Sequence, residues 1–476
     1  MADVKRNFVY NSILTLSNYV FPLIVYPYVS RVLGVGNIGI CNFVDSVVHW
    51  FILISMMGIT ILGNREMAAI GGDRERRDKA FSSLVTLNLA ATLIAALALL
   101  AAMYSVPKLL PYRNLLWVGE LKLFANFLCI EWYFRGTENF KYITGRTILV
   151  KSVYVVAVFL FIRQAEDYPL YYLLTVLMLA ANALINLVYA RRTVTFSLKG
   201  VVPGAYLKPF LTLGLYMLLT SMYVTLNVTW LGFVSGDEQV GYYSTASKLY
   251  SIVIAFFTAF TGVMLPRMSS LVSERRMEDF HRMIDKTFSV LLTFSVPLVT
   301  YACVCAPEIV LAFAGAGYEG AILPARIMMP LILIVGLEQV FVIQILMPKG
   351  HDRAVFYNSI AGAVVGVLLN VLLVRKMQAV GSAIVWISAE LTVLVFAAYF
   401  VRRKDGIAFP WRKLLRLLAG YLPALAGCIG IYALVPQPWV RFGIATAFMG
   451  IYTLVFVLFI QNEETVLTEL HRVLKR

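Results

Sequence analysis

The stretch YVFPLIVYPYVSRVLGVGNIGICNFVDSVVHWFILISMMGI, residues 19–59, contains two apolar runs joined by a short glycine-containing segment. A helix needs roughly 20 mostly apolar residues to cross a bilayer. Apolar runs of this length, separated by short polar gaps, recur along the rest of the chain. The sequence therefore predicts an all-α polytopic membrane protein. We expect about 14 transmembrane helices, at residues 9–31, 38–64, 81–103, 114–134, 148–163, 168–190, 210–234, 241–265, 287–306, 322–347, 354–374, 380–401, 414–435 and 440–461.

Positive charge is distributed unevenly among the gaps between these spans. The chain has 41 Lys and Arg against 26 Asp and Glu, a formal net charge of +15. Most of the basic residues fall in every second gap, as in residues 74–79 and 402–404. Loops rich in Lys and Arg stay on the cytoplasmic side of a membrane. We therefore expect a multi-pass protein of the bacterial inner (cytoplasmic) membrane with both termini cytosolic. Since anionic lipid faces these loops, the surplus charge does not indicate a nucleic-acid partner.

Composition and loop length exclude several classes of protein. The five cysteines form no C-x-x-C pair and no cluster with His, so the sequence indicates neither a metal site nor a disulfide framework. It contains no arrangement of nucleophile and base, and no phosphate-binding glycine loop. The gaps between spans are too short to form an extramembranous domain. We therefore expect no cofactor and no catalytic residue, and a function carried out within the bilayer.

A weak internal repeat relates the two halves of the chain at an offset of 202 residues. Gly39 aligns with Gly241, and Arg65 aligns with Arg267. Chance similarity between apolar segments is the alternative explanation. Parallel repeats with a site between them near the midplane are typical of transporters. The repeat predicts three parts: an N-terminal six-helix lobe (1–200), a C-terminal six-helix lobe (201–405), and two extra transmembrane helices with a cytosolic amphipathic tail (406–476).

Polar residues inside the predicted spans are the candidates for function, because such residues usually face a cavity or a partner. In the span 38–64 they recur at helical spacing, which places them on one face. A hydrated cavity between the lobes explains them best. The uncharged residues expected to line it are Asn18, Asn42, Thr220, Tyr223 and Asn227.

Charged residues in or near the spans suit the binding of an anion. Arg presents a planar fork matched to phosphate oxygens, and Lys presents a point charge. The substrate-binding candidates are Arg31, Lys248, Arg146 and Arg326. Anchoring at the membrane surface is the alternative for each, since long basic side chains can extend to water.

Acidic and aromatic residues complete the set of candidates. Asp45 and His49 are candidates for ion coupling, because a carboxylate can exchange its partner for H⁺ or Na⁺; otherwise, they are structural partners of other polar groups. The run Trp132–Phe134 beside Glu131 predicts an aromatic belt at the membrane interface.

Several runs of sequence resemble one known family. These runs are residues 19–59 with GNREMA after them, IEWYFRGTENFKYITGRTILVK (130–151), and GYEGAILPARIMMPLILIVGLEQVFVIQILMPKGHDR (317–353) followed by NVLLVRKMQAVGSAIVWISAE (370–390). They are similar to the Wzx-type polysaccharide-biosynthesis flippases of the multidrug/oligosaccharidyl-lipid/polysaccharide (MOP) exporter superfamily. Asp45 departs from the uncharged polar residue, such as Gln, expected in many relatives, so its coupling role rests on this sequence alone.

The resemblance implies two six-helix lobes around a cationic central cavity. It implies a transporter, not an enzyme, that moves undecaprenyl-pyrophosphate-linked oligosaccharide repeat units (O-antigen, capsule or exopolysaccharide) by alternating access. Asp45 adds the expectation, from this sequence, that H⁺ or Na⁺ is the coupling ion. Expected partners are that lipid-linked oligosaccharide, membrane lipids, and the polymerase and export machinery. Three alternatives stay open: a cation-coupled multidrug exporter, a lipid II flippase, and, from a different class, a membrane polymerase or glycosyltransferase.

Overall fold

The computed structural model describes residues 2–71 and 73–461, and within them all regular structure is helical. The α-helices are α1 (Ala2–Met56), α2 (Ile59–Ile70), α3 (Arg74–Ser105), α4 (Arg113–Leu128), α5 (Glu131–Gly136), α6 (Phe140–Phe161), α7 (Tyr168–Ala190), α8 (Pro203–Ser235), α9 (Asp237–Ser273), α10 (Met277–Val304), α11 (Ala306–Ala314), α12 (Ile322–Met328), α13 (Leu331–Gln339), α14 (Asp352–Leu369), α15 (Arg375–Asp405), α16 (Trp411–Leu434) and α17 (Pro438–Val455). Short 3₁₀ segments are η1 (Pro107–Tyr112), η2 (Ala165–Asp167) and η3 (Glu319–Ala321), and π-helical segments are η4 (Val340–Leu346), η5 (Asn370–Val374) and η6 (Phe456–Gln461). The predicted amphipathic tail, residues 463–476, lies outside the described residues.

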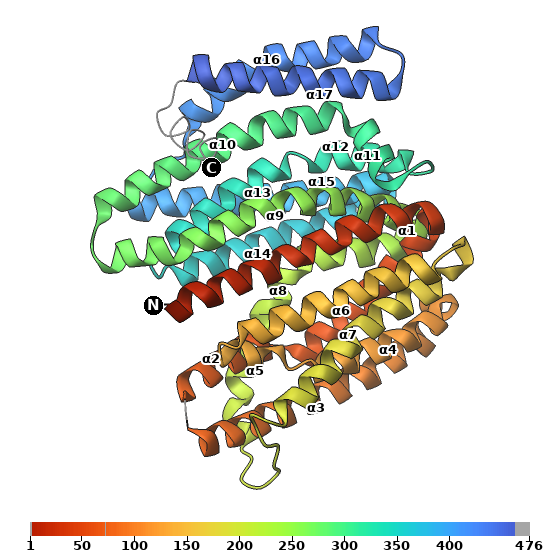
Figure 1. Cartoon of the computed structure of the whole chain (residues 1–476), viewed down its shortest axis with the longest axis vertical. Coiled ribbons are helices and arrows are strands. Elements are labelled where there is room, and N and C mark those ends of the chain that lie inside the picture. The colour runs from red at the N-terminus through yellow and green to blue at the C-terminus, as the bar shows by residue number, and fades with distance from the viewer. Residues whose placement is uncertain (1, 72, 462–476) are drawn as a thin grey trace. The chain divides into compact units, whose positions relative to one another are not determined.

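The chain divides into two compact units, Met1–Gly241 and Tyr242–Arg476. The first unit contains α1 to α8, drawn from red to yellow-green in Figure 1, and the second contains most of α9 and all of α10 to α17. By its packing against α1, α2 and α3, α8 belongs to the first unit. The predicted division into lobes 1–200 and 201–405 and the segment 406–476 stays a prediction.

The predicted all-α polytopic fold is confirmed. Among the described residues, ten helical segments are long and apolar enough to cross a membrane. Two of them, Val9–Ile70 and Asp352–Asp405, each contain two of the predicted spans. The first has 62 residues, about 90 Å of helix at 1.5 Å per residue, against a bilayer core of about 30 Å. The chain changes direction within these segments at Gly34 (φ 75°) and at Gln378 (φ 53°).

Two further helix breaks fall inside predicted spans of the first unit. Met57 (φ 34°) separates α1 from α2, and Ile130 (φ 39°) lies between α4 and α5. At the first break, the Gly58 N–H donates to the Phe210 carbonyl of α8 at 3.2 Å. A Cβ on Gly58 would lie 2.5 Å from the Cβ of Leu213, so only glycine permits this approach of the two chains. Contact with α8 therefore fixes the break.

The aromatic run after Ile130 lies in the core of the first unit. Trp132, Tyr133 and Phe134 are each at most 2% exposed, and the Trp132 ring packs 5.5 Å from that of Phe81. The predicted interfacial belt is therefore wrong for these three residues. Burial of large aromatic rings contributes strongly to a core, and here it holds α5 against α2 and α3.

Replacing Gly63 with alanine should destabilise the first unit. A Cβ on Gly63 would lie 2.3 Å from Cε3 of the buried Trp132, so α2 and α5 would have to move apart. Overpacking of this kind costs about 1–3 kcal/mol, more than the roughly 1 kcal/mol that alanine gains in a helix. Thermal unfolding of the purified protein in detergent should show a lower Tm. Gly145→Ala is the control, since a Cβ at that helical position meets nothing within 4 Å; equal Tm values for both variants would contradict the expectation.

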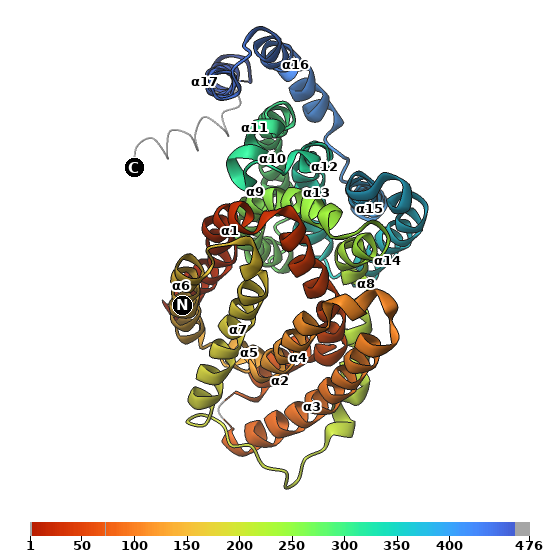
Figure 2. The same ribbon diagram turned by 90° about the vertical axis from the view of Figure 1, so that its right-hand side faces the viewer.

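In the second unit, α16 and α17 lie side by side along α10, as both views show (Figures 1 and 2). A buried ion pair connects them to α11. Glu308 is 1% exposed, and its Oε1 accepts from Arg441 Nε and Nη2, each at 2.7 Å. The Tyr432 hydroxyl donates to the other carboxylate oxygen of Glu308. One carboxylate on α11 is thus held by both helices of the C-terminal pair.

Candidate functional site

An ion pair lies within the helices of the first unit. Asp45 of α1 pairs with Lys122 of α4, and the Tyr172 hydroxyl of α7 donates to the same carboxylate oxygen at 3.4 Å. The Lys122 side chain is 20% exposed and that of Asp45 is 43% exposed. Asp45 is a predicted ion-coupling residue, whereas Lys122 is not among the predicted candidates. The carboxylate is therefore held by a cation and a hydroxyl from two other helices.

A second lysine contacts α1 on the other side of Gly34. Lys151 of α6 donates to Asn18 Oδ1 at 2.6 Å and to Ser17 Oγ at 3.3 Å. Its ammonium also lies 5.6 Å from the centre of the Phe21 ring, within cation–π range. The sequence predicts that Asn18 lines a cavity, and in the structure its side-chain oxygen accepts a hydrogen bond from the Lys151 ammonium.

Arg146 is buried with part of its hydrogen-bonding capacity unused. The residue is 7% exposed, and its Nη2 donates to Thr147 Oγ1 at 2.9 Å. Among the described residues, Nε and Nη1 have no hydrogen-bond partner. Buried donors of this kind usually meet a protein group, water or an ion. The N–H groups on Nε and Nη1 of Arg146 are therefore available to an acceptor. A residue that binds an anion, the role predicted for Arg146, needs such groups.

The remaining candidates of the first unit differ in their surroundings. Arg31 is exposed and donates to the Pro27 carbonyl one turn earlier. Asn42 donates to the Ile38 carbonyl at 2.8 Å, and His49 is exposed on the same helix. Asn227 of α8 is fully buried. The side chains of two candidates lie outside the described part of the chain: Thr220 and Tyr223.

The two candidates of the second unit lie on different helices. Lys248 is partly buried in α9, and Arg326 of α12 is exposed, with its Nε donating to the Cys303 carbonyl at 3.1 Å. The substrate-binding and coupling roles of all these residues stay predictions.

The second unit also buries a carboxyl group, that of Glu390 of α15, which is 6% exposed. The Trp386 indole donates to Glu390 Oε1 at 3.0 Å. In α13, the atom Glu338 Oε2 is buried and has no hydrogen-bond partner among the described residues. Both acidic residues thus lie in segments that are long and apolar enough to cross a membrane.

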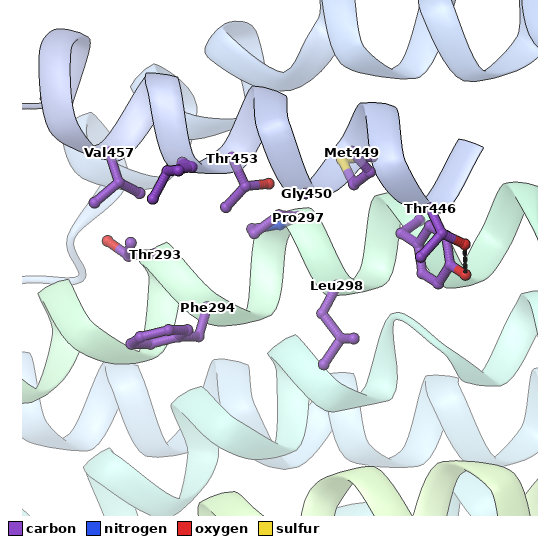
Figure 3. Close-up of a pocket in the computed structure, with 11 residues that line it drawn as sticks. Thr293, Phe294, Pro297, Leu298, Thr446, Met449, Gly450, Thr453 and Val457 are labelled. Carbon is purple, nitrogen blue, oxygen red and sulfur yellow. Dashed lines mark hydrogen bonds between the residues drawn. The ribbon is translucent and has the colours of Figure 1, made fainter. Parts of the chain in front are cut away.

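An apolar groove of about 410 Å³ lies between α10 and α17 (Figure 3). Its lining residues are mostly apolar, and they include Phe294, Pro297, Leu298, Met449 and Leu454. Phe294 and Leu454 are more than half exposed at its edge. Its polar contact, between the Tyr301 hydroxyl and Thr446 Oγ1 at 2.7 Å, is satisfied internally. The groove therefore suits a hydrocarbon chain.

Residues 2–71 and 73–461 contain no group of three His, Cys, Asp or Glu that could hold a metal ion. All five cysteines are free. The functional groups of the described chain are therefore charged and polar side chains within helices, together with the apolar groove.

The helix arrangement is similar to that of solved membrane transporters. It is similar to a lipid II flippase, MurJ, in an inward closed conformation, with a TM-score of 0.74, 15% identity and coverage of 99% of both chains. It is also similar to a multidrug resistance transporter of the MATE family in an inward-facing conformation, with a TM-score of 0.61, 14% identity and coverage of 83% of this chain and 98% of the other. At these identities the similarity shows the fold.

The chain belongs to the polysaccharide biosynthesis protein family, whose model matches residues 4–272. The protein of Escherichia coli strain K12 named "Putative O-antigen transporter" is 23% identical over 409 residues, covering 84% of this chain and 97% of that relative. A protein of the same name from Shigella dysenteriae is 22% identical over 401 residues, covering 83% and 98%. The predicted family is thus confirmed.

Proposed function

We propose that this protein moves undecaprenyl-pyrophosphate-linked oligosaccharide repeat units, of O-antigen, capsule or exopolysaccharide, across the inner membrane by alternating access. The observation that carries the proposal is the pair of lysines held within the helices of the first unit. Lys122 and Lys151 reach α1 from two different helices. Charged groups within membrane helices are costly and usually serve transport. Cations match a diphosphate, and the family is that of polysaccharide biosynthesis.

The ion pair of Asp45 offers a route to ion coupling. When H⁺ binds the Asp45 carboxylate, the attraction to Lys122 is lost and the ammonium becomes available to the anionic substrate. When substrate leaves, the lysine can return and the proton is released. The scheme uses H⁺ as the coupling ion and a residue that the sequence singled out. Na⁺ would act through the same exchange of partners.

The groove between α10 and α17 supplies a place for the lipid part of the substrate. A polyprenyl chain is apolar and unbranched apart from its methyl groups, and the lining side chains offer apolar contact over about 410 Å³. Phe294 and Leu454, which line the groove, are more than half exposed and extend its apolar surface outward. We propose that part of the chain rests there while the saccharide crosses.

The test is complementation of a strain that lacks its own flippase, with surface glycan and the inner-leaflet pool of lipid-linked saccharide as readouts. Wild type should restore export. Lys151→Met removes a charge-assisted hydrogen bond to Asn18 and a substrate cation, so export should fall at least about tenfold, equivalent to about 1.4 kcal/mol. The matched control is Lys199→Met, on an exposed residue. Drug efflux without glycan export by wild type would overturn the proposal.

A further inference from the structure

A cavity of about 700 Å³, lined by both polar and apolar side chains, lies within the first unit and is separate from the ion pair at Asp45. One wall comes from the end of α1 and from α2, with Thr60, Asn64 and Arg65. The other comes from the end of α4 and from α5, with Asn126, Glu131 and Arg135, and Leu179 of α7 completes the lining. Sites for small molecules usually have volumes of about 300–1,000 Å³.

The cavity lies where two membrane helices are interrupted. Its lining includes Met56 and Thr60, on either side of the break at Met57, and Cys129 and Glu131, on either side of the break at Ile130. Interrupted helices at membrane depth are tolerated where they are buried in protein or line a hydrated cavity. Positive φ angles at non-glycine residues are strained, and such strain concentrates at binding sites. Both breaks therefore point to this cavity as a site.

The cationic groups of the cavity are positioned for an anion. Arg135 Nε and Nη2 donate to Glu131 Oε1 at 3.1 and 2.8 Å, which fixes the plane of the guanidinium and leaves Nη1 unused in this contact. Arg65 Nη2 lies 3.9 Å from Glu66 Oε1, and the Arg65 side chain is 63% exposed. The cavity lining thus contains two guanidinium groups, of Arg65 and Arg135, and one carboxylate, that of Glu131.

Uncharged polar groups lie beside these cations. Thr60, Asn64 and Asn126 contribute uncharged polar side chains to the lining. A hydroxyl and two amides offer both donors and acceptors, which is the chemistry that recognises sugar hydroxyls. Trp132, which also lines the cavity, packs against Gly63 and Phe81.

We propose that this cavity binds a phosphorylated sugar, with Arg65 and Arg135 on the phosphate and the two asparagines on the sugar hydroxyls. The proposal rests on the proposed function for the source of that ligand, the saccharide end of the lipid-linked substrate at the predicted cytosolic side. A soluble sugar phosphate has the same chemistry, so the experiment separates the two sources.

The test measures binding of two probes to the purified full-length protein in detergent by titration calorimetry. One probe is a monosaccharide linked to farnesyl diphosphate, and the other is glucose 1-phosphate. Arg65→Gln and Asn64→Asp should each weaken binding of the favoured probe about tenfold, since one loses a charge-assisted bond and the other places a carboxylate beside the phosphate. Both residues are exposed, so the variants should fold as wild type does. Arg74→Gln, an exposed position outside the cavity, is the charge-matched control and should bind normally.

Binding of the farnesyl probe alone assigns the site to the lipid-linked substrate, and binding of glucose 1-phosphate alone assigns it to a soluble metabolite. The proposal is overturned if neither probe binds, or if both variants bind as tightly as wild type. Its failure differs from failure of the proposed function. If the cavity variants export saccharide with an unchanged KM and Lys151→Met loses export, the cavity does not bind the transported substrate, but the proposed function stands. If wild type exports no saccharide but Arg65→Gln still loses glucose 1-phosphate, the site stands and the function falls.

Discussion

Lys122→Met is expected to lower export of the lipid-linked saccharide on the order of 100-fold while the protein still reaches the membrane. The substitution removes the cation that pairs with Asp45 and keeps the contact of Asp45 with the Tyr172 hydroxyl. Without the lysine, the proposed exchange of partners between proton and lysine at Asp45 cannot occur. A 100-fold loss corresponds to about 2.7 kcal/mol. Two quantities are measured: the initial rate of glycan export, and the amount of lipid-linked saccharide that accumulates in the inner leaflet.

Three companion variants separate charge from structure. Lys122→Arg keeps a cation and should retain most of the export. Asp45→Asn should leave a slow export that no longer responds to an imposed pH gradient, because the exchangeable carboxylate is absent. The double variant Lys122→Met with Asp45→Asn should unfold at the wild-type temperature and still fail to export. Normal export by Lys122→Met would mean that the ion pair serves only packing.

Arg441→Met is expected to produce the largest loss of stability in the second unit. Glu308, at 1% exposure, would lose its cationic partner and keep the Tyr432 hydroxyl as its donor. Removing one partner of a buried ion pair costs about 3–5 kcal/mol, because the other charge is left uncompensated. The Tm of the purified protein in detergent should fall by several degrees, and protease should gain access to the segment between α16 and α17.

The control for this prediction is Arg412→Met, which removes an exposed arginine from the start of α16. Its Tm should match that of wild type. The double variant Glu308→Gln with Arg441→Met should recover most of the stability, since a neutral amide is far less costly to bury than a carboxylate. A Tm for Arg441→Met equal to that of Arg412→Met would show that the pair contributes nothing measurable.

Much of the fold follows from the sequence because apolar length alone specifies a membrane helix. The breaks at Met57 and Ile130 do not follow from it, since neither position carries a proline or glycine of its own. The first break depends on the approach of α8 to Gly58, which is a contact between residues far apart in the chain. The run Trp132–Phe134 illustrates the same limit. Aromatic side chains suit an interface and a core equally, and the turn at Ile130 decides between them.

The candidate site was predictable only in part. Asp45 and Asn18 were identifiable as polar groups within spans, but spacing along one helix does not reveal which other helix supplies the partner. Lys122 and Lys151 carried the same signal, an ionisable group inside an apolar run, and could have been included on that ground. Arg65 and Arg135 gave no such signal, because both lie at span ends, where anchoring in the interface is the ordinary explanation.

Gly34 gives α1 a mechanical role. The residue lies between Asn18 and Asp45, so the lysine of α6 is attached to one arm of the helix and the lysine of α4 to the other. If the angle at Gly34 changes, either α4 and α6 move in different directions, or one of the two lysine contacts with α1 breaks. Neutralising Asp45 would remove the contact with Lys122 and leave the contact with Lys151 in place. Under the proposed mechanism, a single proton would therefore change how strongly α1 is coupled to α4, but not how strongly it is coupled to α6.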